Sequence, residues 1–275
     1  MSCRFATIGD NCVDRYLPLD QATVGGNALN VAVQLALQGQ SCQYFGAVGR
    51  DDDGRWTHDM LVQNGVSVDH LQELDAPTAY TNLDVDAAGE RIIVFEEFGA
   101  SADYRPTSAD IAVLAEMDHI HIGWLQETQA LRAALAQSNV TISQDFAVNA
   151  DTTGLDVGFD SVGQSKSRAL TALQKLRETG CKVAVVTCGS MGSLAWAGGD
   201  VVETGIDALS TVSDTTGAGD TYIAGFLAAW KRGRPLAECI IAGRRAAART
   251  CSHLGGFPQP IKPLKLNQRS TLTDV

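Results

Sequence analysis

A glycine-rich turn that opens an apolar helix carries the clearest chemical signal in this sequence of 275 residues. Residues 214–227 read DTTGAGDTYIAGFL, with small residues at Gly217, Ala218 and Gly219 and a carboxylate at Asp220. Small residues let backbone N–H groups converge on an anion, and a helix N-terminus adds donors and a positive dipole end. An acid beside a phosphate is repelled by it, so its presence in such a loop indicates a use, and a general base for a substrate hydroxyl would be one. The pattern therefore indicates phosphoryl transfer. The structural alternative is that Asp220 caps a helix beginning near Thr221.

Other sites built on glycine turns do not fit the spacing. Tyr222 stands where a dinucleotide fingerprint needs a third small residue, and no G-x-x-x-x-G-K-[ST] occurs in the chain. The turn at Gly189 lacks the leading glycine of a hydrolase nucleophile elbow, because position 188 is Cys.

A second polar set near the N-terminus could bind a polyhydroxyl compound. Its members are Asn11, Asp14, Gly25, Gly26, Asn27 and Asn30. Asn11 and Asp14 follow the first apolar strand, where open α/β sheets bind ligands, and Asn and Asp supply paired donors and acceptors. The two glycines allow close backbone approach, and Asn27 and Asn30 share one side of the next helix. Alternatively, Asn27 is an N-cap and Asp14 a turn residue.

Phosphate donors are also expected after the apolar strand 182–187. Thr187, Gly189 and Gly192 supply a hydroxyl and exposed backbone N–H groups there. The same residues could simply form a turn into a strand at Ser193–Trp196.

Short β-branched runs alternate with helical patterns along the chain, which predicts a mainly parallel sheet covered by helices. Strands are predicted at Phe5–Ile8, Cys42–Val48, Ile120–Ile122, Thr141–Asp145 and Lys182–Thr187. Helices are predicted at Ala28–Leu37, Arg55–Asn64, Ser108–Ala115, Gln129–Gln137, Ser167–Thr179, Thr221–Arg232 and Leu236–Cys251. Residues 78–98 break this alternation with period-two runs on either side of 87–90, which predicts a hairpin.

The 214–227 motif resembles the C-terminal motif of the ribokinase-like (PfkB) carbohydrate kinases, and residues 25–39 resemble their N-terminal motif. The resemblance runs from about Phe5 to Gly256. It implies an α/β fold: a three-layer α/β/α kinase domain over residues 1–257, with a mainly parallel central sheet. It also implies that an insertion at about 77–98 forms a small β lid over the sugar, often shared in a homodimer; the alternative is an ordinary edge hairpin. Stretches 9–14, 25–27 and 48–54 are most similar to the fructoselysine 6-kinases of that family.

By this resemblance, Asp220 is the base, the 217–219 amides are the anion hole and the N-terminal polar set contacts a sugar or sugar-amine. ATP would bind through the 187–192 segment, with Mg²⁺ as cofactor and K⁺ near Asp214 and Thr216. Many relatives carry an acid in an N-x-x-E-like segment, but the corresponding residues 160–167 have Gln, Ser and Lys at those places. No protein ligand for magnesium is therefore assigned.

Composition limits the remaining possibilities. The net charge of −11 argues against nucleic-acid and anionic-membrane partners, and no apolar run is long enough to span a bilayer. Seven cysteines without a C-x-x-C pair fit reduced thiols, so a cytoplasmic location is expected. Residues 258–275, rich in Pro, Ser, Thr and Lys, are expected to form a mobile tail.

Two other functions remain open from the sequence. A nucleoside or vitamin-precursor kinase on the same fold would use the anion hole equally well. A sugar-binding regulator that has lost catalysis would explain the altered 160–167 segment.

Overall fold

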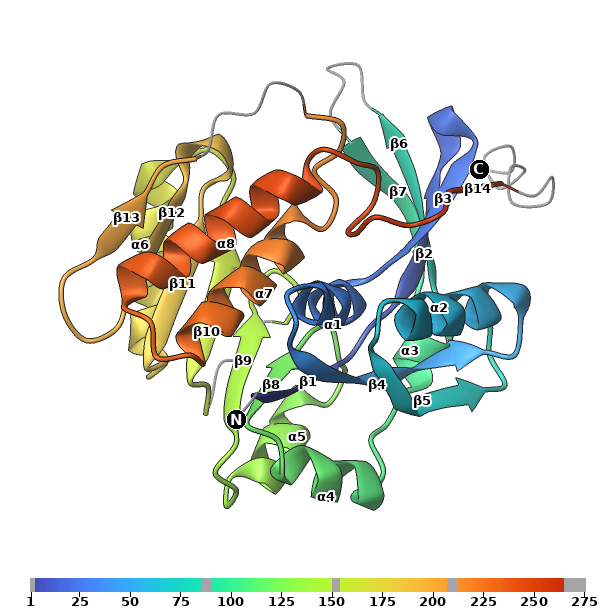
Figure 1. The fold of residues 1–275 in the computed structure, drawn as a ribbon, viewed down its shortest axis with the longest axis horizontal. Coiled ribbons are helices and arrows are strands. Elements are labelled where there is room, and N and C mark those ends of the chain that lie inside the picture. Colours follow the sequence, from blue (N-terminus) through green and yellow to red (C-terminus); the bar gives the residue numbers. More distant parts are fainter. Residues whose placement is uncertain (1–2, 86–90, 150–153, 207–211, 265–275) are drawn as a thin grey trace.

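A nine-stranded sheet forms the centre of the computed structural model, which describes residues 3–85, 91–149, 154–206 and 212–264. Its strand order is β13-β12-β11-β10-β9-β8-β1-β4-β5, parallel from β11 to β5 and antiparallel at β12 and β13. These strands are β1 (Arg4–Ile8), β4 (Ser41–Gly49), β5 (Ser67–Leu74), β8 (His119–Ile122), β9 (Thr141–Asp145), β10 (Val157–Ser161), β11 (Val183–Thr187), β12 (Ser193–Trp196) and β13 (Val202–Thr204). The mainly parallel sheet predicted from the sequence is confirmed (Figure 1).

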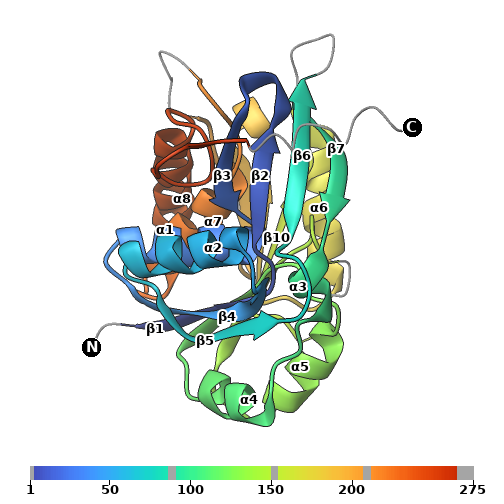
Figure 2. The same ribbon diagram turned by 90° about the vertical axis from the view of Figure 1, so that its right-hand side faces the viewer.

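Helices cover both faces of this sheet and complete the three layers (Figure 2). Phe5 of β1 packs with the helices on one face, α1 (Asn27–Leu37), α2 (Asp52–Gln63), α7 (Ala218–Trp230) and α8 (Leu236–Thr250). Ala6 and Ile8, which point the other way, pack with the helices on the opposite face, and α6 covers the neighbouring strands there. That face carries α3 (Gly99–Asp103), α4 (Ser108–Ala115), α5 (Thr128–Leu135) and α6 (Lys166–Glu178). Because helices bury both faces, the predicted strands read as continuous apolar runs.

Side chains hold the starts of two helices, one by a local cap and one from a distant residue. Helix α4 has the predicted bounds because Thr107 and Asp110 form a reciprocal capping box. Helix α1 has no side-chain cap of its own, since Gly26 is its N-cap residue. The Asp10 carboxylate substitutes for one by accepting the N–H groups of Asn27 (2.8 Å) and Ala28 (3.2 Å). A loop residue from the end of β1 thus holds the start of α1.

A second, five-stranded sheet stands beside the central one, in the order β14-β3-β2-β6-β7 (Figures 1 and 2). Its strands are β2 (Cys12–Tyr16), β3 (Gln21–Gly25), β6 (Tyr80–Val85), β7 (Arg91–Glu97) and β14 (Lys262–Pro263). The predicted hairpin is confirmed by the antiparallel pairing of β6 with β7, although its turn at 86–90 lies outside the described residues. The sheet is larger than expected because β2 and β3 belong to it as well.

Residues 259–264, expected to belong to a mobile tail, instead pack against the second sheet. Gln259 exchanges two 2.8 Å hydrogen bonds with the backbone N–H and C=O of Val24. Strand β14 pairs with β3, and the Leu264 side chain is buried. The prolines that favoured a tail are compatible with this edge position, where few backbone donors are needed. Residues 265–275 lie outside the described part.

Within the described ranges, no helix is long and apolar enough to cross a membrane.

Candidate active site

Asp220 is the third residue of α7, directly after the glycine-rich turn. The helix begins at Ala218 and its N-cap residue is Gly217, which has a φ of 70° and makes no side-chain cap. The carboxylate of Asp220 accepts hydrogen bonds from the Nδ2 atoms of Asn27 and Asn30, both at 2.7 Å. The structural alternative for Asp220 is therefore wrong, because the helix begins before it and its oxygens face α1.

Asn27 and Asn30 share one side of the first turn of α1, as predicted, while Val31 and Leu35 lie in the core. Asn27 is the first helical residue rather than the N-cap. Asn30 is only 3% exposed. Each amide uses its nitrogen for Asp220, and each Oδ1 is buried without a protein partner in the described residues. The amides therefore orient the acid and do not neutralise it.

Glycines let the three segments around Asn30 come together. A Cβ at Gly256 would lie 2.4 Å from Asn30 Oδ1, and a Cβ at Gly217 would lie 2.4 Å from Gly256 Cα. A Cβ at Gly25 would lie 2.4 Å from Asp14 Oδ2 and 3.9 Å from Asn30 Nδ2. These distances exclude a side chain at each position. Gly219 differs, since a Cβ there would meet nothing within 4 Å.

Three aspartates converge at this place. Burial raises the pKa of Asp220 well above its ordinary value, and the charges of Asp145 and Asp10 add to the effect against the opposing hydrogen bond from Asn30. Burial likewise raises the pKa of Asp145 to about 6 and raises that of Asp10. Asp145 is linked to the same amide as Asp220, because Asn27 Nδ2 also donates to Asp145 Oδ2 at 3.0 Å. A carboxylate with a raised pKa is a stronger base than an exposed aspartate.

The predicted N-terminal polar set divides into two groups. Asp14 lies within β2, not in a turn, and its carboxylate lies close to Gly25. Asn11 lies behind this group with 1% exposure, and its Nδ2 donates to Tyr44 Oη at 3.0 Å and to the Ala47 carbonyl at 2.7 Å. Gly26 has a φ of 107° and approaches the Asn11 backbone. Asn11 thus ties the loop after β1 to β4, and the sugar contact expected of it stays a prediction.

The 187–192 segment ends β11 and runs through a 3₁₀ turn at Gly189–Met191 into β12, confirming the strand expected there. The altered 160–167 segment lies against it, because a Cβ at Gly189 would lie 3.2 Å from Gln164 Cγ. A cavity of about 280 Å³ opens beside this segment and is lined by Lys166, Cys188, Met191, Ser193, Leu194, Glu203, Thr204 and Gly205. Ser193 is hydrogen-bonded to Tyr222 at 2.7 Å, which joins the segment to α7 two residues after Asp220.

Asp214 is 2% exposed and joins three segments. Its carboxylate accepts the Tyr16 hydroxyl at 3.0 Å, the Gly255 N–H at 2.8 Å and the Thr216 N–H at 2.6 Å. The structure therefore gives Asp214 a role in tying the glycine turn to β2 and to the loop after α8.

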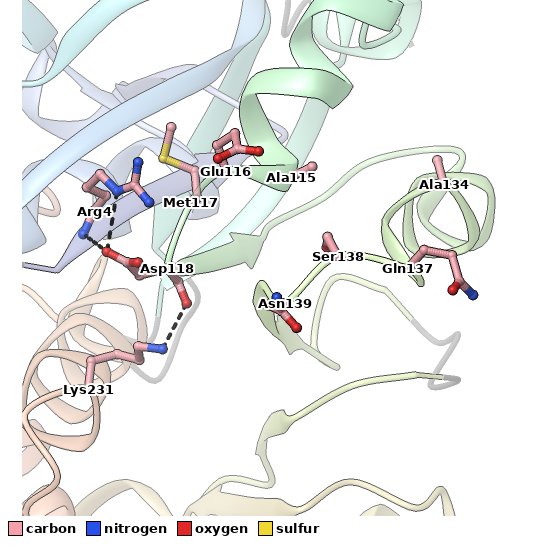
Figure 3. Close-up of a pocket in the computed structure, with 10 residues that line it drawn as sticks. All are labelled: Arg4, Ala115, Glu116, Met117, Asp118, Ala134, Gln137, Ser138, Asn139 and Lys231. Atoms are coloured by element: carbon pink, nitrogen blue, oxygen red, sulfur yellow. Dashed lines mark hydrogen bonds and ion pairs between the residues drawn. The ribbon is translucent and has the colours of Figure 1, made fainter.

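The large cavity in Figure 3, about 710 Å³, lies at the end of the sheet where the central parallel strands begin. Arg4 begins β1 there, and its backbone N–H donates to Asp118 Oδ2 at 2.7 Å. Lys231 Nζ donates to the Asp118 carbonyl at 2.8 Å. Lys231 follows the last residue of α7, whereas Asp220 lies in its first turn, so the length of the helix separates this cavity from the candidate site.

Comparisons with known proteins identify the family to which the chain belongs. The model of the pfkB family carbohydrate kinases matches residues 18–160 and 157–261. The chain belongs to the pfkB family of carbohydrate kinases. This pfkB kinase is 33% identical over 260 residues to fructoselysine 6-kinase of Escherichia coli, covering 92% of this chain and 98% of that one. It is 26% identical over 265 residues to fructosamine kinase FrlD of Bacillus subtilis, covering 92% and 93%.

Among solved structures, the fold of this pfkB kinase is similar to that of Arabidopsis thaliana ribokinase complexed with ribose and ATP. The TM-score is 0.82 at 19% identity, with 93% and 94% of the two chains covered. The ribokinase-like fold is confirmed, and the protein is an ATP-dependent carbohydrate kinase.

Sequence reasoning missed two acids of the site, Asp10 and Asp145. Asp145 ends a predicted strand of a parallel sheet, and Asp10 follows another, so the rule that ligands lie beyond the carboxyl ends of strands could have found both. Their contacts with Asn27 depend on tertiary structure and had no sequence signal.

Proposed function

We propose that this kinase transfers the γ-phosphoryl group of ATP to a primary hydroxyl of a sugar or fructosamine, with Asp220 as the general base. The observation that carries the proposal is the Asp220 carboxylate, held at 2.7 Å by two amides in the first turn of a helix. The substrate hydroxyl gives its proton to Asp220 as its oxygen bonds to phosphorus. The bond from phosphorus to the bridging oxygen then breaks, and ADP leaves.

The start of α7 suits the charge that develops on the transferred group. Gly217, Ala218 and Gly219 precede Asp220 at the positive end of the helix. The Ala218 N–H already donates to the Thr215 carbonyl at 3.2 Å, so we assign the main donor roles to Gly217 and Gly219. The open space beside Gly219 is consistent with a phosphoryl group approaching there.

We infer that the substrate is a fructosamine such as fructoselysine, phosphorylated at its 6-hydroxyl. Support comes from the fructoselysine 6-kinase and fructosamine kinase relatives. A second support is a row of paired residues on one face of the second sheet: Thr23, Asp14, Thr81 and Glu96. Paired residues of neighbouring strands share a face, so Glu96, which sequence reasoning missed, lies on the same face as Asp14. Two carboxylates on that face would favour a cationic amine over a neutral sugar.

ATP is proposed to bind along Thr187, Gly189 and Gly192, beside the 280 Å³ cavity. Mg²⁺ would arrive on the nucleotide, because Mg²⁺ keeps several waters and is bound largely through phosphates. In the described ranges, no three His, Cys, Asp or Glu side chains form a metal-binding group, so no protein ligand is assigned. A K⁺ site at Asp214 and Thr216 stays a prediction from the family resemblance.

A homodimer formed through the lid is part of the proposal. Strand β7 is the edge of the second sheet, and it exposes Ile92 (41%), Ile93 (60%), Val94 (39%) and Phe95 (46%). An uncovered apolar edge strand favours pairing with a second copy. Light scattering at high micromolar concentration should report a dimer, and a monomer there would contradict this part of the proposal. Cytoplasmic location stays a prediction.

The proposed reaction is tested by ADP release from Mg·ATP with fructoselysine, fructose, ribose and adenosine, using wild type beside Asp220→Asn. We expect turnover with fructoselysine, and a fall of about 10²–10⁴-fold in kcat in the variant with sugar binding retained. Near-normal turnover in Asp220→Asn would remove its role as base. Turnover of a different sugar alone would contradict fructosamine as the substrate and would still support phosphoryl transfer to a sugar. Silence across the panel with binding intact would favour a sugar-binding regulator.

A further inference from the structure

A buried acid with no part in the reaction described above shares an amide with the proposed base. Asp145, the last residue of β9, is 9% exposed. Its Oδ1 accepts the Ala147 N–H at 2.9 Å, and its Oδ2 accepts Asn27 Nδ2 at 3.0 Å. The same nitrogen donates to Asp220 Oδ1 at 2.7 Å. Asp145, Asn27 and Asp220 thus form a continuous chain of hydrogen bonds between β9 and α7.

This arrangement specifies the orientation of the Asn27 side chain. An amide nitrogen carries two hydrogens, and here one is available for each carboxylate. If the amide turned over, its oxygen would face two carboxylates and both hydrogen bonds would be lost. The Asn27 backbone is fixed independently, since its N–H donates to Asp10 Oδ2 at 2.8 Å. With only Asp220 as acceptor, the side chain would have one fewer bond to hold it.

The buried Asp145 carboxylate is unfavourable for the stability of the fold, which indicates a functional role. A buried carboxylate without a compensating cation is destabilising, and like charges close together add to this. The charged groups that face Asp220 are Asp145 from β9 and Asp10 from the loop after β1. Those that face Asp145 are Asp220, Asp10 and, from β10, Asp160. An asparagine or an apolar residue at position 145 would avoid this repulsion.

We infer that Asp145 is a positioning residue for phosphoryl transfer, which acts through Asn27 to aim the Asp220 carboxylate at the substrate hydroxyl and to keep it basic. The inference rests on the proposed role of Asp220 as base. It assigns Asp145 no contact with substrate. Misplacement of a reacting group by about 1 Å can lower a rate by about 10²-fold, so an effect on kcat of about 10- to 100-fold is expected.

A double-mutant cycle separates action through Asn27 from an unrelated effect. We would measure kcat for wild type, Asp145→Ala, Asn27→Ala and the double variant, with thermal unfolding as a check on folding. If Asp145 acts through Asn27, each single change lowers kcat by about 10- to 100-fold and the double variant is little worse than Asn27→Ala. Effects that multiply would overturn the inference, as would an unchanged kcat in Asp145→Ala.

The pH profile provides a second readout, one that a merely structural residue would not move. In the isosteric Asp145→Asn variant, loss of the neighbouring charge lowers the pKa of Asp220, so the acid limb of kcat/KM should move to lower pH. Carbon-13 titration of the Asp220 carboxyl in the same variant needs no turnover. It should show the same direction of change even if the enzyme proves inactive on every sugar tried. An Asp220 titration that does not respond to Asp145→Asn overturns the inference, whereas a silent wild type overturns only the proposed function.

Discussion

The ionisation of Asp145 makes a prediction about stability that needs no knowledge of the substrate. Burial raises its pKa from 3.8 to about 6. An acid with a raised pKa binds its proton more tightly in the folded state, so stability is lost as the pH rises from 3.8 through about 6. At about 1.4 kcal/mol for each pH unit, ionised Asp145 destabilises the fold by about 3 kcal/mol well above pH 6. About half of that, roughly 1–2 kcal/mol, develops between pH 5 and pH 8.

The assay is urea unfolding of wild type and Asp145→Asn at pH 5 and pH 8. The free energy of unfolding of the variant minus that of wild type should be larger at pH 8 than at pH 5, by roughly 1–2 kcal/mol. Asp118→Asn is the control. A hydrogen bond from the Arg4 backbone lowers the pKa of the Asp118 carboxyl below 3.8. Asp118 is therefore ionised at both pH values, and its contribution to the free energy of unfolding does not change between them. Its substitution should alter stability equally at both pH values.

A difference between the two proteins that does not change from pH 5 to pH 8 would refute the reasoning. It would mean that water or a small rearrangement satisfies the Asp145 carboxylate in the folded state, and its pKa would then be ordinary. A variant that becomes less stable relative to wild type as the pH rises would contradict the predicted direction of the effect as well. Either result would also weaken the case that Asp145 raises the basicity of Asp220.

Three further substitutions test the packing beside Asn30, the cap of α4 and the core around Phe226. Gly256→Ala should lower kcat by about 10- to 100-fold, because its Cβ would lie 2.4 Å from the Asn30 amide that holds Asp220; Gly199→Ala, where a Cβ meets nothing within 4 Å, should leave steady-state kinetics unchanged. Thr107→Ala should lower the free energy of unfolding by about 0.5–2 kcal/mol by removing the capping box of α4; a smaller loss in urea titration would mean that the cap is dispensable. Phe226→Ala, which removes a fully buried ring packed edge-on against Phe159, should lower that free energy by about 3–5 kcal/mol; a loss below 1 kcal/mol would contradict tight packing there.

The sequence predicted the elements whose local pattern and burial agree. Strand β9 has its predicted bounds, and the strands buried on both faces were visible as apolar runs. Strand β2 was not predicted, because its sequence CVDRY places Asp14 and Arg15 in a buried element. Arg15 is accommodated only by tertiary contacts, a 3.2 Å ion pair with Asp53 and stacking 3.6 Å from the centre of the Tyr80 ring. No local pattern reports such partners.

The contrast between local sequence patterns and tertiary contacts applies to the site as well. The glycine turn and Asp220 were visible because their chemistry is written in consecutive residues. The partners of Asp220 come from α1, and Asp145 comes from β9, so only the folded chain shows that one amide joins two acids. The hydrogen bonds that Asn11 makes to Tyr44 and Ala47 of β4 had no sequence signal for the same reason, because the partners are more than 30 residues away in the chain.

The pairing of β14 with β3 bears on how the protein is made. Strand β3 leads into α1 and the amides that hold Asp220, yet its outer edge is covered by Gln259 and β14 from the far end of the chain. During synthesis from the N-terminus, the outer edge of β3 therefore waits with unpaired backbone groups until residues 259–263 have emerged. A chain that stops before residue 259 would leave an open strand edge next to the segment that leads into α1, and an open edge of this kind is prone to aggregate.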